Sequence, residues 1–538
     1  MTVRADHERA PIYETLTNYA RNGIYGFHTP GHKGGRFAAP ELTELVGRSG
    51  LALDLPAMTA TDNTFHPTGC VRDAQALAAD LFGAGSTFFL TAGSTLGVAT
   101  ALLAAVPPGG TVVLPRNVHR SVVAGLVLSG ALPRFAQHDV VVDCGALGVS
   151  AESIATALDA NPKPAAVLLT RPSYYGLARN LADVADACHA RGVPVIIDEA
   201  HGGHFCFLPR SDGRLACRDS GDAGREGTAH QCADHGASMP VVGGADPTAG
   251  EPLAATPQSA LSLGADLAIQ SCHKTLGSLV GSAQLHVGRK SLISAERVQH
   301  ALNFLQTTSP NYLLLASLDV MRRHLARHGS ELFASAYEDS RSLADEIDSI
   351  PGMRVFRVEN DPRLTGHRQD PLRLVVNISG TGWSGYDVER YLRTEYRVED
   401  EMADQFSVVY ILSPHDDAAA RARLLAGLRA LSGKGRGSRV EGRGPESGLS
   451  THLLQPPIPP LAMAPREAAL SAQTMVDRER AAGRTCAEMV MFYPPGIPLL
   501  MPGEVVTQET LDVCQQLLAA GANPYASDPT FQTICVVQ

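Results

Sequence analysis

The sequence predicts an α/β protein with three parts: a large domain built on a mostly parallel sheet, a smaller α/β domain, and a separate C-terminal α+β domain. Two observations predict the large domain. Between about Thr61 and Val287, apolar strand patterns alternate with helical patterns, as they do in a parallel sheet covered on both faces. Within this span, residues 193–197 form an uninterrupted run of apolar residues and proline, which suits a strand buried on both faces.

The elements outside that span follow from composition and hydrophobic pattern. Pro11–Asn22 is expected to form a short helix, and Gly23–Leu55, which is rich in Gly, Pro and His, an irregular arm. A helical stretch from Asn311 to Ile350 is expected to connect to the smaller domain. The strands of that domain are predicted near residues 353–358, 372–378 and 408–411.

Two stretches interrupt this pattern. Residues 211–257 show no hydrophobic period, so we expect a surface insertion, with a functional lid as the alternative. Residues 432–448 combine Gly, Ser and charge as flexible linkers do, and the C-terminal domain then begins as a helix with Pro465 near its first turn. The predicted segments are an N-terminal helix and arm (1–60), the large domain (61–310), the small domain (311–431), a linker (432–463) and the C-terminal domain (464–538).

Composition narrows the classes of function. The chain has 538 residues, of which 44% are hydrophobic, enough for two or three domains with cores of their own. A net charge of −10 and an isoelectric point near 6.0 give no basic footprint for nucleic acid, and a mildly acidic surface suits a cationic substrate. We find neither an apolar stretch of about 18 residues that could span a membrane nor a secretory signal, so a cytoplasmic location is expected.

The segment GADLAIQSCHKTL, residues 264–276, carries the first candidate catalytic residue. An apolar strand runs directly into Ser271, His273 and Lys274. A lysine held among apolar neighbours has a lowered pKa and can form a Schiff base with an aldehyde cofactor, whereas an exposed lysine is merely solvated. We therefore interpret Lys274 as the covalent anchor for pyridoxal 5'-phosphate, against the alternative of a surface lysine after a core strand.

Two strand–turn–helix segments offer contacts for such a cofactor. In FFLTAGSTLG the strand is followed by Gly93, Ser94 and Thr95 at the start of a helical run, which brings backbone N–H groups, hydroxyls and a helix N-terminus to a phosphate. The alternative is an ordinary helix cap. In VVLPRNVHRSVV, His119 lies on the turn after a strand, where an imidazole either stacks on a cofactor ring or has a structural role alone.

A fourth segment, VPVIIDEAHGGHF, places acids at the end of its strand. Asp198 and Glu199 lie where the active sites of open α/β sheets are found, and an acid there can keep a pyridine nitrogen protonated. His201 and His204 follow, but neither a helical HExxH pattern nor zinc-like cysteine spacing accompanies them. No metal site is therefore predicted.

Eight motifs in order give the chain a family resemblance. They are FHTPGHKGG, TDNTFHPTG, FLTAGST, PRNVHRSV, DEAHGGHF, GADLAIQSCHKTL, QTTSPNYLLLASLD and YPPGIPLLMPGE. Together they resemble the ornithine/lysine/arginine decarboxylases of the aspartate-aminotransferase-like fold, which is fold type I of the pyridoxal phosphate enzymes, and most of all the short biosynthetic arginine/lysine type. The resemblance covers nearly the whole chain. It implies decarboxylation of a basic L-amino acid for polyamine synthesis, with arginine favoured over lysine and ornithine.

The resemblance also implies roles for the candidate residues. Lys274 would hold the cofactor, Asp198 would stabilise its protonated pyridine, and His119 would stack on its ring. Further cofactor contacts would come from Gly93, Ser94, Thr95, His201, Ser271 and His273. The sequence leaves the donor of the proton to Cα open between Lys274 and His273.

Two further segments carry implied contacts. QTTSPNY resembles the place where family members pass a hydroxyl into the partner subunit's phosphate site, so Thr307 and Ser309 are expected to act across the interface of a homodimer or a larger even-numbered homo-oligomer. VEDEMADQF resembles the segment that supplies acids to the distal cation of the substrate, with Glu401 and Asp404 as the best matches. The alternative for these acids is a solvated loop.

The chain departs from the family pattern at two positions without losing an essential function, and other classes of function stay open. Ala92 stands where Asn is common, and Cys272 where Thr is common. Another pyridoxal enzyme of this fold, such as an aminotransferase or a lyase, would share Lys274 and Asp198, but an aminotransferase would produce a keto acid. A noncatalytic relative that regulates a decarboxylase has no need for the lysine, the phosphate-binding turn and the acid together.

Overall fold

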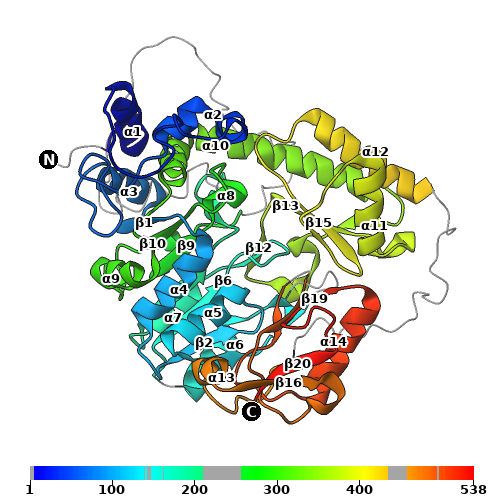
Figure 1. Ribbon diagram of the computed structural model, residues 1–538. Helices are drawn as coiled ribbons and strands as arrows, with labels where there is room; N and C mark the ends of the chain where they lie inside the picture. Colours follow the sequence, from blue (N-terminus) through cyan, green and yellow to red (C-terminus); the bar gives the residue numbers. More distant parts are fainter. Residues whose placement is uncertain are drawn as a thin grey trace, which may run out of the picture.

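The computed structural model describes residues 5–138, 140–141, 147–161, 163–209, 256–433, 457–493 and 496–538. Most of the predicted insertion and of the predicted linker lie outside these ranges. Figure 1 shows the large sheet and its helices in blue to green, a second sheet in yellow-green, and the C-terminal part in orange to red beside both.

The large sheet confirms the predicted, mostly parallel architecture. Its seven strands follow the order β1-β10-β9-β8-β6-β2-β3, in which β9 through β3 pair in parallel and β10 pairs antiparallel with both β1 and β9. Neighbouring residues Ile196 and Ile197 pack into different core clusters, so both faces of the sheet are buried. The strands are β1 (Ser86–Leu90), β2 (Thr111–Pro115), β3 (Leu132–Ala136), β6 (Ala166–Thr170), β8 (Val195–Asp198), β9 (Leu267–Gln270) and β10 (Ala283–Val287).

Helices cover this sheet and begin where its strands end. Because β2, β8 and β9 all point the same way, the turns after them meet at one edge. One helix, α4, packs tightly on the sheet because Gly97 has no side chain: a Cβ there would lie 2.6 Å from Cγ2 of Ile269. The helices are α3 (Cys70–Phe82), α4 (Gly93–Ala105), α5 (Arg120–Ser129), α6 (Ala151–Ala160), α7 (Ala182–His189), α8 (Cys272–Thr275) and α9 (Ala295–Leu305).

The N-terminal segment is more helical than predicted. α1 (Pro11–Arg21) confirms the short helix, but the arm also contains α2 (Pro40–Leu53). Pro40 opens α2 at a position that favours proline, and Gly47, with φ +78°, kinks it. The expectation of an irregular arm was therefore wrong over residues 40–53. That prediction extended the Gly- and Pro-rich character of the preceding residues over this stretch.

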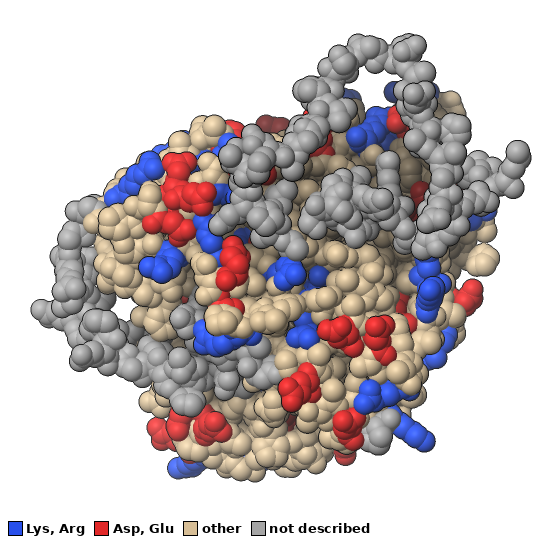
Figure 2. Space-filling model, turned by 180° about the vertical axis from the view of Figure 1, so that it is seen from behind, with Lys and Arg blue, Asp and Glu red and all other residues tan. Residues whose placement is uncertain are grey.

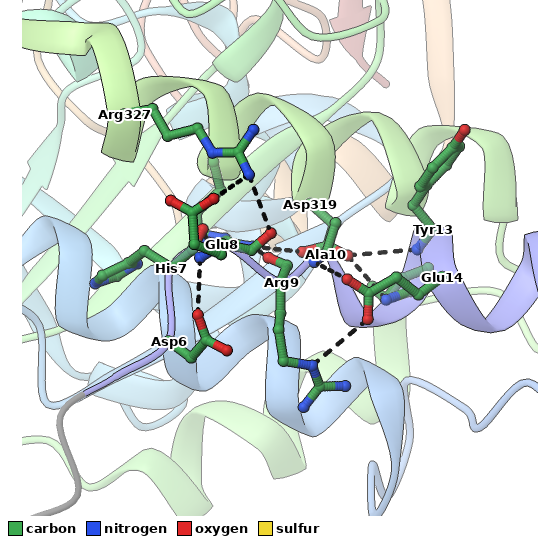
Figure 3. Close-up of polar contacts among 11 residues, drawn as sticks. Asp6, His7, Glu8, Arg9, Ala10, Tyr13, Glu14, Asp319 and Arg327 are labelled. Atoms are coloured by element: carbon green, nitrogen blue, oxygen red, sulfur yellow. Dashed lines mark hydrogen bonds and ion pairs between the residues drawn. The ribbon is translucent and has the colours of Figure 1, made fainter.

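A side chain from a distant helix caps α1. Asp319 of α10 (Tyr312–Asp348) accepts hydrogen bonds from the backbone N–H groups of Ile12 at 2.8 Å and Tyr13 at 3.4 Å (Figure 3). At the surface, Arg327 of the same helix pairs with Glu8. Since the N-cap residue of α1 is an alanine, α10 satisfies the open end of α1 and fixes the N-terminal segment against the long connector helix.

The second sheet contains the three strands predicted for the smaller domain. It has the order β11-β13-β15-β14, all antiparallel, and packs with the second half of α10 around one apolar cluster. β7 (Leu177–Arg179) pairs with β12 (His367–Gln369) and ties this part to the large domain. Its elements are β11 (Arg354–Val355), β13 (Arg373–Asn377), α11 (Gly385–Tyr391), β14 (Met402–Ala403), β15 (Ser407–Ile411) and α12 (Ala418–Gly433).

The C-terminal part has its own apolar cluster and is of the predicted α+β type. The predicted helix begins at Pro465 and ends at Leu470, and a strand follows it. Its elements are α13 (Pro465–Leu470), β16 (Gln473–Asp477), β17 (Val490–Tyr493), β18 (Pro498–Leu500), α14 (Gln508–Ala520), β19 (Asn523–Tyr525) and β20 (Thr533–Val537). A short hairpin of β4 (Val140–Val141) and β5 (Leu147–Gly148) completes the strands of the described residues.

On the face shown in Figure 2, Lys and Arg are interspersed with Asp and Glu rather than forming one basic field. Within the ranges that the structure describes, we find no helix with the length and apolar character needed to cross a membrane.

Candidate active site

Lys274 lies at the carboxyl edge of the large sheet with its side chain turned inward. β9 ends at Gln270, Ser271 precedes α8, and Nζ of the lysine is 2.8 Å from Nε2 of His201. Burial is the main cause that lowers the pKa of Lys274, while the charges of Asp198 and Glu401 oppose it. Lys274 is therefore not a solvated surface lysine.

The hydrogen bonds around His201 determine which form this lysine takes. Arg373 donates from Nη2 to Nδ1 of His201 at 2.8 Å. A guanidinium only donates, so Nδ1 must accept, and the ring is neutral with its proton on Nε2. That N–H donates to Nζ of Lys274, which accepts only as a free amine. Burial, followed by the nearby charge of Arg373, holds the pKa of His201 well below its usual value, in agreement with a neutral ring.

Asp198 provides negative charge at this site. It is the last residue of β8, its side chain is buried, and its Oδ1 accepts a hydrogen bond from the backbone N–H of Ala200 at 3.2 Å. Its charge acts on both Lys274 and His119, and in each case it raises a pKa that burial lowers. The structure therefore brings Asp198, Lys274 and His119 together at the edge where β2, β8 and β9 end.

His119 is held by the start of α5. It is the N-cap residue of that helix: its Nδ1 accepts from the backbone N–H of Ser121 at 3.2 Å and lies 2.8 Å from the Ser121 hydroxyl. Burial lowers the pKa of His119, and the positive charge of Arg120 lowers it further. The ring is thus neutral and fixed in orientation at the rim of the site.

The predicted phosphate-binding turn is joined to the loop that follows Lys274. Gly93 has φ +70°, a conformation that favours glycine, and its N–H donates to the carbonyl of Gly281 at 2.8 Å. Ala92 occupies the N-cap of α4 and provides no capping side chain, so this end of the helix stays open to a ligand. Ser94 is partly buried and Thr95 exposed at the same end.

Two further predicted contacts differ in their surroundings. The Ser271 hydroxyl is buried and has no hydrogen-bond partner among the described residues. Because Ser271 directly precedes α8, which carries Lys274, its hydroxyl is placed to complete its hydrogen bonding with a ligand. His273, in contrast, already contacts the carbonyl of Ser282 through Nδ1 at 2.8 Å.

The two predicted substrate acids lie in different environments. Glu401 is partly buried, and its charge raises the pKa of Lys274 and of Arg373, so it lies near enough to act on both. Asp404 instead accepts hydrogen bonds from the Tyr175 hydroxyl at 2.7 Å and from the N–H groups of Phe406 and Ser407 at 2.7 and 2.8 Å. The carboxylate of Asp404 is thus occupied by its own turn and by Tyr175.

Sequence reasoning missed three residues of the site. Arg373 opens β13 from the second sheet, Tyr174 packs its ring 5.1 Å from that of His201, and Tyr493 comes from the C-terminal part. Burial raises the pKa of both tyrosines, and the charge of Glu401 raises it further. The single arginine at the start of the apolar run RLVVN could have indicated Arg373. The motif YPPGIPLLMPGE contains Tyr493, but the sequence alone assigned this tyrosine no role.

Three further residues of the sequence motifs lie in different surroundings. Thr307 and Ser309 are exposed after α9, and the Ser309 N–H donates to the Thr307 hydroxyl at 3.1 Å; their action across an interface stays a prediction. His204 lies 2.9 Å through Nε2 from Oδ1 of the buried Asp370. Across the part of the chain that the structure describes, no three His, Cys, Asp or Glu side chains gather as metal ligands.

Comparisons with known proteins give one family. Residues 10–231 and 251–420 match the profile of the Orn/Lys/Arg decarboxylase major domain, and residues 449–533 match that of the C-terminal domain of the same family. An arginine decarboxylase of Halalkalibacterium halodurans is 34% identical over 99% of this chain and 98% of its own length. An arginine decarboxylase of Bacillus subtilis is 33% identical over 96% of this chain and 95% of its own length.

Solved structures support the same fold. Lysine decarboxylase A from Pseudomonas aeruginosa superimposes with a TM-score of 0.76 at 21% identity, covering 98% of this chain and 80% of that one. The constitutive lysine decarboxylase of Escherichia coli gives a TM-score of 0.74 at 19% identity, with the same coverage. From its fold, its profile matches and its relatives, the chain belongs to the Orn/Lys/Arg decarboxylase family, as the ordered motifs of the sequence predicted.

Proposed function

We propose that this decarboxylase acts on arginine, with pyridoxal 5'-phosphate held at Lys274. The observation that carries the proposal is the hydrogen-bonded series from Arg373 through His201 to Lys274, which keeps a buried lysine in the nucleophilic, neutral form. A neutral amine near a buried carboxylate, that of Asp198, is the arrangement that an aldehyde cofactor with a basic ring nitrogen requires.

The residues present fit this cofactor. The open N-terminus of α4 and the buried hydroxyl of Ser271 suit a phosphate. Asp198 suits a protonated pyridine nitrogen, and the neutral ring of His119 suits stacking. When bound, pyridoxal phosphate supplies an electron sink for the pair released as the bond from Cα to the carboxylate breaks. The other proposed phosphate contacts are Gly93, Ser94, Thr95 and His273.

The chain's own residues perform the remaining tasks. Lys274 is ready to capture the aldehyde, since its amine is already deprotonated. After carbon dioxide leaves, a proton must reach Cα, and Lys274 and His273 are the candidate donors. We propose that Arg373 holds His201 and does not bind the substrate carboxylate. An ion pair between Arg373 and that carboxylate would stabilise the bound substrate more than the transition state, in which negative charge leaves the carboxylate.

Arginine is the favoured substrate because of the groups near Glu401. The charge of Glu401 acts on the aromatic residues Tyr174 and Tyr493, and a planar guanidinium both pairs with a carboxylate and stacks on aromatic rings. The two relatives at 34% and 33% identity are arginine decarboxylases. Asp404 has its carboxylate occupied, so we propose that it shapes the wall of the site rather than binding the substrate.

We propose a homodimer as the minimal assembly. Val280 is exposed and directly precedes Gly281, whose carbonyl accepts the Gly93 hydrogen bond, so a second copy that covers it would border the phosphate-binding turn. Contiguous exposed apolar surface marks interaction sites, and we propose that the following residues form such a surface in the dimer. The large apolar side chains that we assign to this interface are Phe27 (95% exposed), Phe37 (84%), Val280 (83%), Leu45 (82%) and Phe304 (72%).

Oligomer mass tests the assembly. We expect Phe304→Arg to reduce the mass measured by light scattering, while Leu470→Arg, which changes an equally exposed residue on the C-terminal part, leaves it unchanged. A wild-type protein that is monomeric at micromolar concentration contradicts the proposal.

A cytoplasmic location also stays a prediction.

Product identification tests the reaction. Purified protein is supplied with pyridoxal phosphate and with arginine, lysine or ornithine, and the amine and carbon dioxide are measured. We expect agmatine from arginine with the largest kcat/KM of the three. A keto acid without an amine would indicate an aminotransferase, and no product together with no cofactor absorbance would indicate a noncatalytic relative.

A further inference from the structure

Two sequence motifs with no assigned connection meet in the fold. Arg116 of PRNVHRSV and Glu504 of YPPGIPLLMPGE form a bidentate ion pair, with Nη1 2.5 Å from Oε1 and Nη2 2.9 Å from Oε2. Both side chains are fully buried. The arginine also donates to the carbonyl of Leu499 at 2.8 Å, and the N–H of Met501 donates to Glu504 at 2.8 Å. The pair therefore ties the turn after β2 to the C-terminal part.

A buried ion pair of this kind is not explained by stability alone. Taking two charges out of water costs about as much as their attraction returns, and apolar residues of similar size often stabilise a protein equally well. What the pair does provide is a fixed geometry, because two parallel N–H···O bonds orient the guanidinium. Arg116 directly follows β2 and precedes His119 by three residues.

A second contact holds the other side of His119. The guanidinium of Arg120, the first residue of α5, lies 4.5 Å from the ring centre of Tyr525 in β19. Its charge is one of those that lower the pKa of His119. Residues on both sides of His119 are thus attached to the C-terminal part, whose helix α13 packs against α5 (Figure 1).

We propose that the C-terminal part positions His119, and thereby sets the affinity for the cofactor, through the Arg116–Glu504 and Arg120–Tyr525 contacts. These four are positioning residues: they act through the turn that carries His119 and do not touch the reacting atoms. The inference rests on the proposed function only in taking pyridoxal phosphate as the group that His119 faces.

Surface variants give the first test. Tyr525 is about half exposed, so Tyr525→Ala is expected to fold, and Tyr525→Phe keeps an aromatic ring as a conservative control. Arg466→Ala is the matched control, since Arg466 joins the same C-terminal part to the other end of α5 through the carbonyl of Leu128 at 3.2 Å. The readouts are hydrogen–deuterium exchange of a peptide spanning residues 116–125 in the full-length apoprotein, and the Kd for pyridoxal phosphate from absorbance titration.

We expect Tyr525→Ala to speed exchange in that peptide and to weaken pyridoxal phosphate binding about two- to fivefold, in line with an exposed cation–π contact. Tyr525→Phe and Arg466→Ala should leave both readouts at wild-type values. Equal exchange and equal Kd in Tyr525→Ala and wild type overturn the contribution of this contact. A wild type that does not bind pyridoxal phosphate refutes the proposed function instead, while the exchange of the apoprotein still tests the positioning, so the two failures are distinguishable.

The buried pair gives the second test. Replacing both partners, Arg116→Met with Glu504→Leu, is expected to keep the thermal midpoint near that of wild type, because no unpaired charge remains. On our proposal the exchange of residues 116–125 still rises and the Kd still increases, about fivefold or more. If this double variant retains both wild-type exchange and wild-type cofactor affinity, the pair has no positioning role and the inference is wrong.

Discussion

Nε2 of His201 lies 2.8 Å from Nζ of Lys274, and the imidazole is the donor in this hydrogen bond. The direction follows from the opposite ring nitrogen, which accepts the N–H of Arg373 at 2.8 Å. A cation from the second sheet thus sets the tautomer of a histidine from the large domain, and the histidine in turn selects the neutral form of the lysine. The protonation state of Lys274 is therefore controlled by Arg373, which lies outside the large sheet that carries the lysine.

The first prediction concerns Arg373. In Arg373→Gln, a positive charge that lowers the pKa of Lys274 is gone, so that pKa should rise. Capture of pyridoxal phosphate requires the free amine, which forms only as the pH rises through this pKa. The pH at which capture reaches half its maximal rate should therefore shift upward, as measured by stopped-flow absorbance of apoprotein mixed with pyridoxal phosphate. Arg373→Lys keeps the charge and is the control; an unchanged midpoint in Arg373→Gln would refute the series.

The second prediction concerns the buried hydroxyl of Ser271. Ser271→Ala removes no side-chain hydrogen bond to a described residue, so the denaturation midpoint of the apoprotein should stay at or slightly above that of wild type. A hydrogen bond to a charged phosphate contributes about 1.5–3 kcal/mol, and the Kd for pyridoxal phosphate should accordingly rise about tenfold or more. Ser407→Ala removes a similarly buried hydroxyl in the second sheet and should change neither quantity. Loss of stability in apo Ser271→Ala would show a structural role.

Sequence reasoning located the residues that one sheet brings together. Lys274, Asp198 and His119 each lie at or just beyond the end of a strand, and those three strands run in parallel within the same sheet. Their turns converge as a consequence of that topology. Because apolar runs are enough to place such strands, these residues were predictable as a group from the pattern of strand ends.

Other features depend on how distant parts of the chain dock, which a local pattern does not contain. Arg373 and Tyr493 reach the site from the second sheet and the C-terminal part, and no hydrophobic period links either of them to Lys274. Asp404 illustrates a different limit. Its match to a family segment implied substrate binding, but its carboxylate accepts hydrogen bonds from its own turn, a use that a sequence match does not distinguish from the role of Glu401.

The third prediction compares these two acids. Glu401→Gln removes a charge that acts on Lys274 and that we propose binds the substrate cation, so the KM for arginine should rise about tenfold or more, as expected for a charged hydrogen bond of about 1.5–3 kcal/mol. Asp404→Asn keeps an acceptor for the N–H groups of Phe406 and Ser407 and should change the KM much less. Steady-state kinetics with arginine measures both variants. A larger rise in KM for Asp404→Asn than for Glu401→Gln would restore Asp404 as a substrate ligand.

The fourth prediction concerns stability and pH. Burial raises the pKa of Asp404 to about 6 from its ordinary 3.8, so the folded protein holds this proton more tightly than the unfolded chain does. The resulting stabilisation is fully present below pH 3.8 and is lost as the pH rises through about 6, with a loss of at most about 3 kcal/mol. Asp404→Asn has no such proton, and its free energy of unfolding should fall less than that of wild type between about pH 4 and pH 7. Urea denaturation at several pH values measures this difference, and parallel profiles for the two proteins would show that Asp404 titrates normally.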